Sequence, residues 1–189
     1  FTKTIIPRLN NKIDNRNEYK KLVNTSFDFS CFLSFPFFIG TLFLSKNMLY
    51  IIGKENFLSA DNILKILSGL LIFSFMAVFL DTNISIPHNK EKNTFYGNIG
   101  VMAVSVVGSL ILTKKYGGIG SAIAIALGEF IGVLIQLFFI KKQNLYLEFF
   151  NKNILKYLFS ALIMGAIIFN IKLQKFGYLE EFILCFILG

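Results

Sequence analysis

The sequence contains no Trp, one His and two Cys among its 189 residues. Cys31 and Cys185 both lie inside apolar runs, so their placement predicts neither a disulfide framework nor a thiolate metal site. The sequence also lacks the spacings of zinc proteases, serine hydrolases and phosphate-cradling loops. His88 stands alone in a short polar loop, where a solvated surface position is the simplest interpretation. We therefore expect no catalytic residues, no metal and no cofactor, and we predict that the protein is not an enzyme.

Long apolar runs dominate the chain instead. Apolar residues make up 54% of it, Phe alone accounts for 23 residues, and the mean hydropathy is +0.63. A soluble domain of this length would rarely gather its apolar residues into unbroken runs of about twenty, the length that crosses a hydrocarbon core of about 30 Å. The composition predicts an all-α fold, a polytopic transmembrane helical bundle.

Five complete spans are predicted, with partial spans at both ends, in a single transmembrane unit. Pro36 falls near the middle of the first span, where the missing backbone donor can kink a helix. Residues 46–61 are too polar to cross a membrane, and we predict one short interfacial helix there, over 48–52, ended by Gly53. The chain starts and stops inside apolar runs, which we interpret as those of a longer protein. The complete spans are 22–45, 62–86, 94–113, 118–140 and 153–171, and the partial spans are 1–6 and 176 onward.

The fourth span, residues 118–140, carries the most informative pattern. A tight turn precedes it, so we expect the third and fourth spans to be antiparallel neighbours. Small residues recur every four positions, which places a ladder of them along one side of a helix, the surface by which membrane helices approach closely. At about 100° per residue, bulky apolar side chains gather on another side, and Ser121, Glu129 and Gln136 form a thin polar seam between them. The ladder is Gly120, Ala124, Gly128 and Gly132, and the bulky side is Ile123, Leu127, Phe130, Leu134 and Leu137.

Glu129 is the single charged residue of the fourth span, at the twelfth of its 23 positions. An ionised carboxylate near the bilayer centre costs at least ~2.5 kcal/mol on insertion scales. One interpretation is functional: a coupling-ion or proton site, or part of a substrate cavity wall. The other is structural: a carboxyl group that is hydrogen-bonded to a neighbouring helix, through Ser105 or Asn98. The sequence leaves both interpretations open.

Lys and Arg are unevenly shared between the two sides of the predicted spans. Twelve fall on one side and six on the other, with Lys65 left out because it lies within a span. Cytoplasmic loops carry the excess of positive charge, so the richer side is predicted to be cytoplasmic. The glycine-rich start of the fourth span then faces outward. The cytoplasmic set is Lys3, Arg8, Lys12, Arg16, Lys20, Lys21, Lys90, Lys92, Lys141, Lys142, Lys152 and Lys156, and the outer set is Lys46, Lys54, Lys114, Lys115, Lys172 and Lys175.

The formal net charge of +8 raises the question of an anionic partner. Nucleic acid is one candidate for a basic chain, but in an integral membrane protein the charge more simply indicates cytoplasmic loops beside anionic lipid, or a path for an anionic substrate. We predict membrane lipids as partners and no nucleic acid.

Four more charged residues are candidates for a site. Arg8 is ordinary as a cytoplasmic anchor, but its guanidinium also suits bidentate phosphate binding. Lys65, about one turn inside its span, can contact a phosphate or, in the favoured interpretation, extend to water. Asp28 and Asp81 are candidates for a coupling or cavity role, although both lie near the cytoplasmic ends of their spans, where an interfacial position is favoured.

Four stretches of the chain resemble a known family. They are TKTIIPRLNNKIDNRNEYKKL (2–22), FPFFIGTLFLSKNMLYIIGKENFLSAD (35–61), IPHNKEKN (86–93) and, most strongly, LILTKKYGGIGSAIAIALGEFIGVLIQLFFIKK (110–142). Taken in order, they resemble the C-terminal half of the polysaccharide repeat-unit flippases that serve O-antigen and capsule synthesis. That family belongs to the multidrug, oligosaccharidyl-lipid and polysaccharide exporter superfamily, which also holds the lipid II flippase.

The resemblance implies a fold and an activity. The family has two six-helix lobes that form a V around a cationic cavity, and it works by alternating access between the membrane faces. The resemblance places residues 1–142 at the end of the second lobe and residues 143–189 in additional C-terminal helices, the last one truncated. The implied substrate is an undecaprenyl-pyrophosphate-linked oligosaccharide, flipped from the cytoplasmic to the outer leaflet of the bacterial inner membrane. A polysaccharide polymerase is a further expected partner.

Two rival functions follow from the same sequence. A multidrug or toxin extruder would share the architecture, but clustered bases fit a cationic substrate less well than carboxylates would. A polytopic glycosyltransferase or acyltransferase would need several carboxylates or His gathered at one interface, and the longest loops offer little beyond Lys, Asn and single acids.

Overall fold

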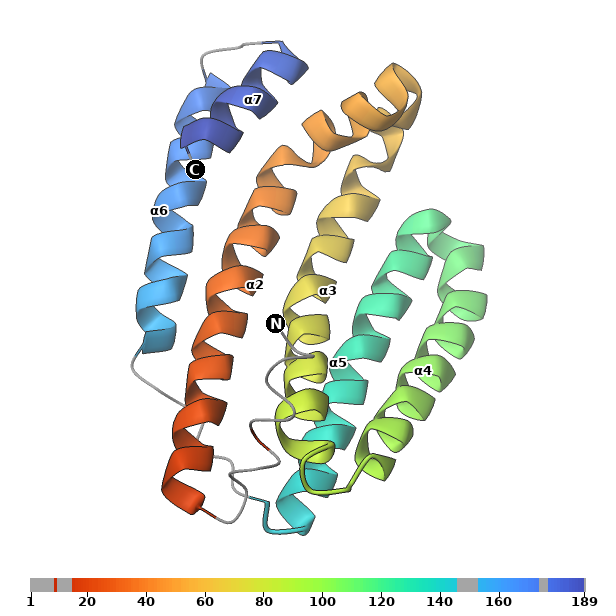
Figure 1. The fold of residues 1–189 in the computed structure, drawn as a ribbon. Coiled ribbons are helices and arrows are strands. Elements are labelled where there is room, and N and C mark those ends of the chain that lie inside the picture. Colours follow the sequence, from red (N-terminus) through yellow and green to blue (C-terminus); the bar gives the residue numbers. More distant parts are fainter. Residues whose placement is uncertain (1–8, 10–14, 146–152, 174–176, 189) are drawn as a thin grey trace.

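The computed structural model describes residue 9 and residues 15–145, 153–173 and 177–188, and every regular element in those ranges is a helix (Figure 1). Four helical stretches there are long and apolar enough to cross a membrane. The first of them, Arg16–Ser85, turns back on itself and passes twice, which gives five passes. The prediction of an all-α transmembrane bundle is confirmed.

The first helix, α2, runs without interruption from Arg16 to Gly53 and contains Pro36. Its 38 residues correspond to about 57 Å at about 1.5 Å per residue, so both polar ends extend beyond a hydrocarbon core of about 30 Å. The prediction of a separate helix over 48–52 is wrong. Asn47 and Leu49 are buried, and these tertiary contacts favour continuing the helix past the end of the apolar run.

The end of α2 also differs in detail from the prediction. Gly53 is its last residue, as expected, but Lys54 takes the positive φ, at 52°. A 3₁₀ turn, η1 (Lys54–Ala60), then reverses the chain into α3 (Asp61–Leu80). A π-helical turn, η2 (Asp81–Ser85), closes α3. Such turns are rare and frequently mark functional sites.

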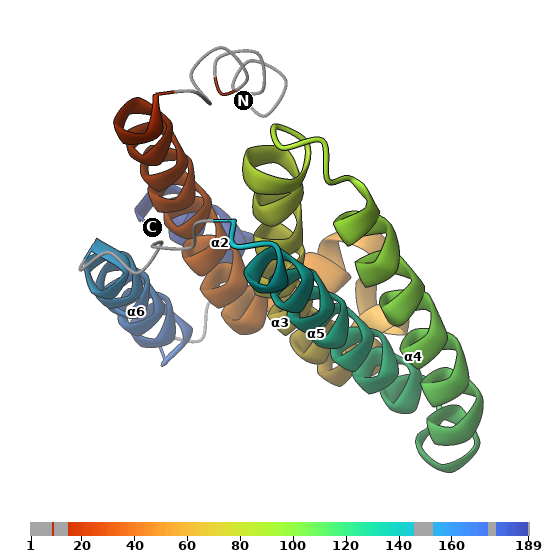
Figure 2. The same cartoon turned by 90° about the horizontal axis from the view of Figure 1, so that it is seen from below.

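The next two helices form a tight antiparallel pair, as predicted. α4 (Lys92–Tyr116) and α5 (Gly118–Lys142) are joined by Gly117 alone. Gly117 has φ 59° and ψ −141°, a backbone conformation that suits glycine. Seen end-on, α5 lies between α3 and α4 (Figure 2).

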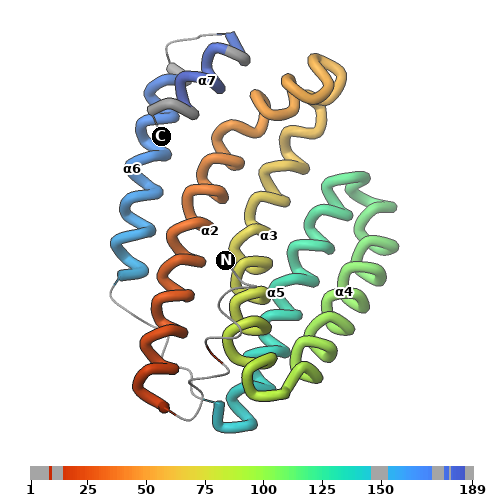
Figure 3. The backbone as a smooth tube through the Cα atoms, in the orientation of Figure 1, coloured from red at the N-terminus to blue at the C-terminus, as the bar shows by residue number. Residues whose placement is uncertain are grey.

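The main apolar core lies where α2, α3 and α5 meet. Phe27 of α2 contacts Phe79 of α3 at a ring distance of 5.1 Å, and Val133 of α5 is buried beside them. The last helices, α6 (Asn153–Leu173) and α7 (Tyr178–Leu188), pack on the opposite side of α2 (Figure 3). The described chain is therefore a four-helix unit with a helical hairpin docked on α2.

Candidate functional site

The small-residue ladder of α5 is the contact surface with α4. All four ladder residues are buried. A Cβ added at Gly128 would meet the Ser105 hydroxyl and the Val101 carbonyl oxygen, and one added at Gly132 would meet the Val101 side chain. Glycine is therefore required for the backbones of α4 and α5 to come this close. The predicted packing role of the ladder is confirmed.

Glu129 lies between the contacts that α5 makes with α4 and with α3. Its neighbour Gly128 faces α4, whereas Phe130, one residue further, contacts Phe73 of α3 at a ring distance of 5.3 Å. With about 100° between successive residues, Glu129 therefore lies on the side of α5 between these two contacts, which we call the α3–α4 side. Its side chain is half-buried.

No hydrogen bond or ion pair to Glu129 occurs among the described residues, including the two partners considered from the sequence. Asn98 is exposed, and the buried Ser105 hydroxyl oxygen has no hydrogen-bond partner. The structural interpretation of Glu129, a carboxyl group bound to a neighbouring helix, thus finds no support in the described part of the chain.

A stripe of three hydroxyl residues runs along α4 and begins at Ser105, whose hydroxyl faces Gly128 of α5. Ser105, Ser109 and Thr113 recur every four residues and line a shallow hollow that ends at Lys114. Thr113 Oγ1 lies 2.6 Å from the Ser121 Oγ of α5, which ties the stripe to the polar seam. Ser121 and Glu129 are eight residues apart, about 80° around the helix, so both lie on the same side of α5.

We call Glu129, Ser121 and the stripe Ser105–Ser109–Thr113 the polar face. The third member of the predicted seam, Gln136, does not belong to it. Gln136 is 2% exposed and packs against the position of Gly97 on α4. Of the three predicted seam residues, Ser121 and Glu129 thus belong to this face. The contact of Ser121 with a hydroxyl of α4 required the structure.

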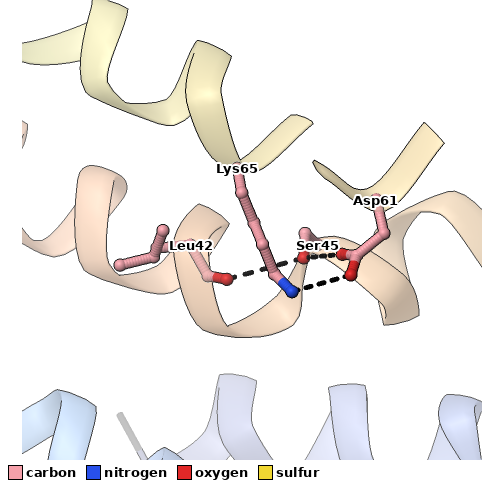
Figure 4. A network of polar contacts seen from close by, with 4 residues as sticks. All are labelled: Leu42, Ser45, Asp61 and Lys65. Atoms are coloured by element: carbon pink, nitrogen blue, oxygen red, sulfur yellow. Dashed lines mark hydrogen bonds and ion pairs between the residues drawn. The ribbon is translucent and has the colours of Figure 1, made fainter. Parts of the chain in front are cut away.

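A second polar cluster joins α2 to the start of α3 (Figure 4). Lys65 Nζ lies 2.7 Å from Asp61 Oδ2, and Ser45 of α2 donates to the other carboxylate oxygen. The same hydroxyl lies 3.5 Å from the Leu42 carbonyl oxygen, a weaker alternative acceptor. Asp61, 7% exposed and at the start of α3, is favoured there by the helix dipole. Lys65 is therefore engaged in an ion pair in the first turn of α3.

The remaining predicted residues link helices. Asp28 Oδ2 accepts from Asn153 Nδ2 at 3.2 Å, which connects α2 to the start of α6. Asp81 Oδ1 accepts from Thr94 Oγ1 at 2.5 Å, which connects η2 to the start of α4. Arg8 lies outside the described residues. The described candidates, Glu129, Lys65, Asp28 and Asp81, are spread over the structure, and of these four Glu129 alone belongs to the polar face.

The C-terminal end of α3 and the turn η2 hold polar groups that the sequence did not single out. Tyr19 of α2 donates to the Asn83 carbonyl oxygen at 2.6 Å. Asn83 Oδ1 and Ser85 Oγ are buried without a hydrogen-bond partner. His88 is half-buried against the Tyr19 ring, at a ring distance of 5.3 Å, so the prediction of a solvated His is wrong. The polar run DTNIS at the end of an apolar span was the available signal.

Two known proteins resemble this chain, and no protein-family model matches it. The capsular polysaccharide biosynthesis protein CapF of Staphylococcus aureus is 24% identical over 144 residues, which are 75% of this chain and 36% of CapF. The solved structure of the lipid II flippase MurJ, in an inward closed conformation, superposes with a TM-score of 0.64 and 25% identity. That likeness covers 99% of this chain and 41% of MurJ, so the chain spans well under half of each protein it resembles. The chain is a multi-pass membrane protein whose helices are arranged as in part of a lipid-linked-substrate flippase.

Proposed function

We propose that this chain forms part of a flippase that moves undecaprenyl-pyrophosphate-linked oligosaccharide repeat units across the bacterial inner membrane, toward the outer leaflet. One observation carries the proposal: nearly the whole chain superposes on the lipid II flippase MurJ. The sequence likeness to CapF, a capsular polysaccharide biosynthesis protein, supports a surface-polysaccharide substrate over other lipid-linked ones.

The arrangement of helices supports a place within a larger transporter. α4 is covered on one side by α5, and much of its remaining surface is apolar and exposed, including Met102, Leu110 and Ile111. In the proposed protein, residues 1–142 belong to the second of two lobes. The α3–α4 side of α5, which carries Glu129, faces the substrate path. A polysaccharide polymerase receives the flipped repeat unit.

The polar face supplies chemistry that suits this path. Serine and threonine hydroxyls donate to and accept from sugar hydroxyls. Glu129, half-buried and without a partner among the described residues, provides either an acceptor for substrate hydroxyls or a site for a coupling cation. Arg8 and Lys65 are proposed contacts for the pyrophosphate, and Lys65 must leave Asp61 to make one.

Deleting the gene of the full-length protein tests the proposal. We expect lipid-linked repeat units to accumulate on the cytoplasmic face and surface polysaccharide to be lost. The wild-type gene on a plasmid should remove the accumulation and restore the surface polysaccharide. Intact surface polysaccharide without such accumulation refutes the flippase assignment.

Glu129→Gln tests the polar face separately. We expect surface polysaccharide output to fall by about tenfold, which corresponds to about 1.4 kcal/mol, at unchanged protein abundance. Glu55→Gln is the matched control, because Glu55 is an exposed carboxylate in η1. Full output from Glu129→Gln at every pH and ion condition shows that this carboxylate plays no part in transport.

A further inference from the structure

A buried polar pair holds α7 against α2. Asn47 of α2 is 0% exposed and Glu181 of α7 is 6% exposed. The Asn47 amide nitrogen donates to Glu181 Oε2 and to the Tyr178 carbonyl oxygen, both at 2.9 Å. Both amide hydrogens are therefore used. The two acceptors also define the orientation of the amide group, because the opposite orientation would place Asn47 Oδ1 against two oxygens.

The pair leaves two buried oxygens without a hydrogen-bond partner, Asn47 Oδ1 and Glu181 Oε1. Each shares a carbon with an atom of the Asn47–Glu181 hydrogen bond, so both oxygens belong to the same buried contact between α2 and α7. Both are acceptors, and the carboxylate brings a formal negative charge. A buried acceptor that lacks a donor costs free energy, and a buried charge without a counterion costs more.

The described surroundings offer no positive group to Glu181. On α2, the nearest basic residue in sequence is the exposed Lys46, and on α7 the adjacent Glu180 is exposed and acidic. The Asp61 carboxylate already occupies Lys65. The Tyr50 ring of α2 and the Tyr178 ring of α7 add an aromatic contact between the two helices, with centroids 4.8 Å apart and planes tilted by 31°. On α6, Lys172 lies outside the described side chains.

We propose that Asn47 and Glu181 form a binding site for one small positive ligand, held between Asn47 Oδ1 and Glu181 Oε1. The ligand is a proton or a single alkali-metal cation, since either satisfies both oxygens and neutralises the carboxylate. The site lies between α2 and α7, on the side of α2 away from the polar face, so it is separate from the proposed substrate path. Occupancy stabilises the docking of α7 on α2.

Thermal unfolding of the purified full-length protein in detergent tests the site. One series varies NaCl against choline chloride at constant ionic strength and pH 7.5, and the other varies pH from 8 to 5.5 without sodium. We expect the wild-type Tm to rise by about 3 °C or more in at least one series, because a ligand that binds only the folded state stabilises it. A rise with sodium identifies a metal cation, and a rise with falling pH identifies a proton.

Glu181→Gln provides the decisive comparison. The glutamine amide can accept from Asn47 Nδ2 and donate to Asn47 Oδ1, so it satisfies the pair without charge or ligand. We expect its Tm without sodium at pH 8 to equal or exceed that of the wild type, and its response in both series to disappear. Glu180→Gln, the exposed neighbour, is the matched control and should keep the wild-type response. A wild-type protein that responds in neither series, or a Glu181→Gln variant that responds as the wild type does, overturns the proposal. These outcomes do not depend on whether the protein is a flippase.

Discussion

Gly128→Ala tests whether the α4–α5 contact depends on the absence of a side chain. The added Cβ would lie 2.9 Å from the Val101 carbonyl oxygen and would also collide with the Ser105 hydroxyl. Ser105 can rotate away, but the Val101 oxygen belongs to the backbone of α4. The two helices must therefore separate, and we expect the variant to be less stable than the wild type.

The magnitude follows from a comparison with Gly69→Ala. Gly69 lies in the interior of α3, and a Cβ added there meets nothing within 4 Å. Both substitutions gain about 0.5–1 kcal/mol from the better helix propensity of alanine. Gly128→Ala alone loses about 1–3 kcal/mol to overpacking. The propensity gain cancels in the difference, which leaves the steric cost, or about 2–12 °C in Tm at about 2–4 °C per kcal/mol.

The cysteines provide the assay. Cys31 and Cys185 are both buried, so a thiol-reactive dye reports their exposure as the protein unfolds on heating. Far-UV circular dichroism of the same variants checks that helix content is retained before heating. If Gly128→Ala unfolds at the same temperature as Gly69→Ala, the ladder is not a close-packing surface and the reasoning fails.

Two further substitutions are tested in the same assay. Lys65→Met should cost about 1 kcal/mol, a value expected for a partly exposed ion pair, because it leaves the buried Asp61 carboxylate without its counterion. The double variant Asp61→Asn/Lys65→Met should recover most of the loss, and a strictly additive double variant would show that the pair does not interact. Gly117→Ala should cost about 1–3 kcal/mol although its Cβ meets nothing, because φ is 59° there, and an unchanged Tm would show that the turn adapts without strain.

The spans were predictable because a membrane imposes simple demands on a sequence. Residues 118–140 had to be apolar and long, and α5 occupies Gly118–Lys142. The four-residue spacing of the ladder predicted a contact surface, because a helix turns that spacing into one side. In contrast, the apolar run of the first span ended at residue 45, but α2 continues to Gly53. Tertiary burial of Asn47 and Leu49 outweighs the local loss of apolar character.

The candidate sites were less accessible to prediction, since their partners are distant in sequence. Glu129 attracted attention through its charge, yet only the contacts of Gly128 and Phe130 place it on the α3–α4 side of α5. Asn47 and Glu181 are 134 residues apart and neither belongs to a motif. Likewise, the hydrogen bond from Tyr19 to the Asn83 carbonyl oxygen of η2 joins residues that are 64 positions apart.

The sequence by itself thus determined that this protein lies in a membrane and where its apolar helices run, because hydrophobic length acts locally along the chain. The uneven positive charge adds a prediction of their orientation. It also determined which side of α5 packs closely. Only the tertiary structure decided which polar groups meet, because buried hydrogen bonds and charges depend on where separate helices bring their side chains together. That is why Asp28 and Asp81 turn out to bind neighbouring helices, whereas Glu129 stays without a partner among the described residues.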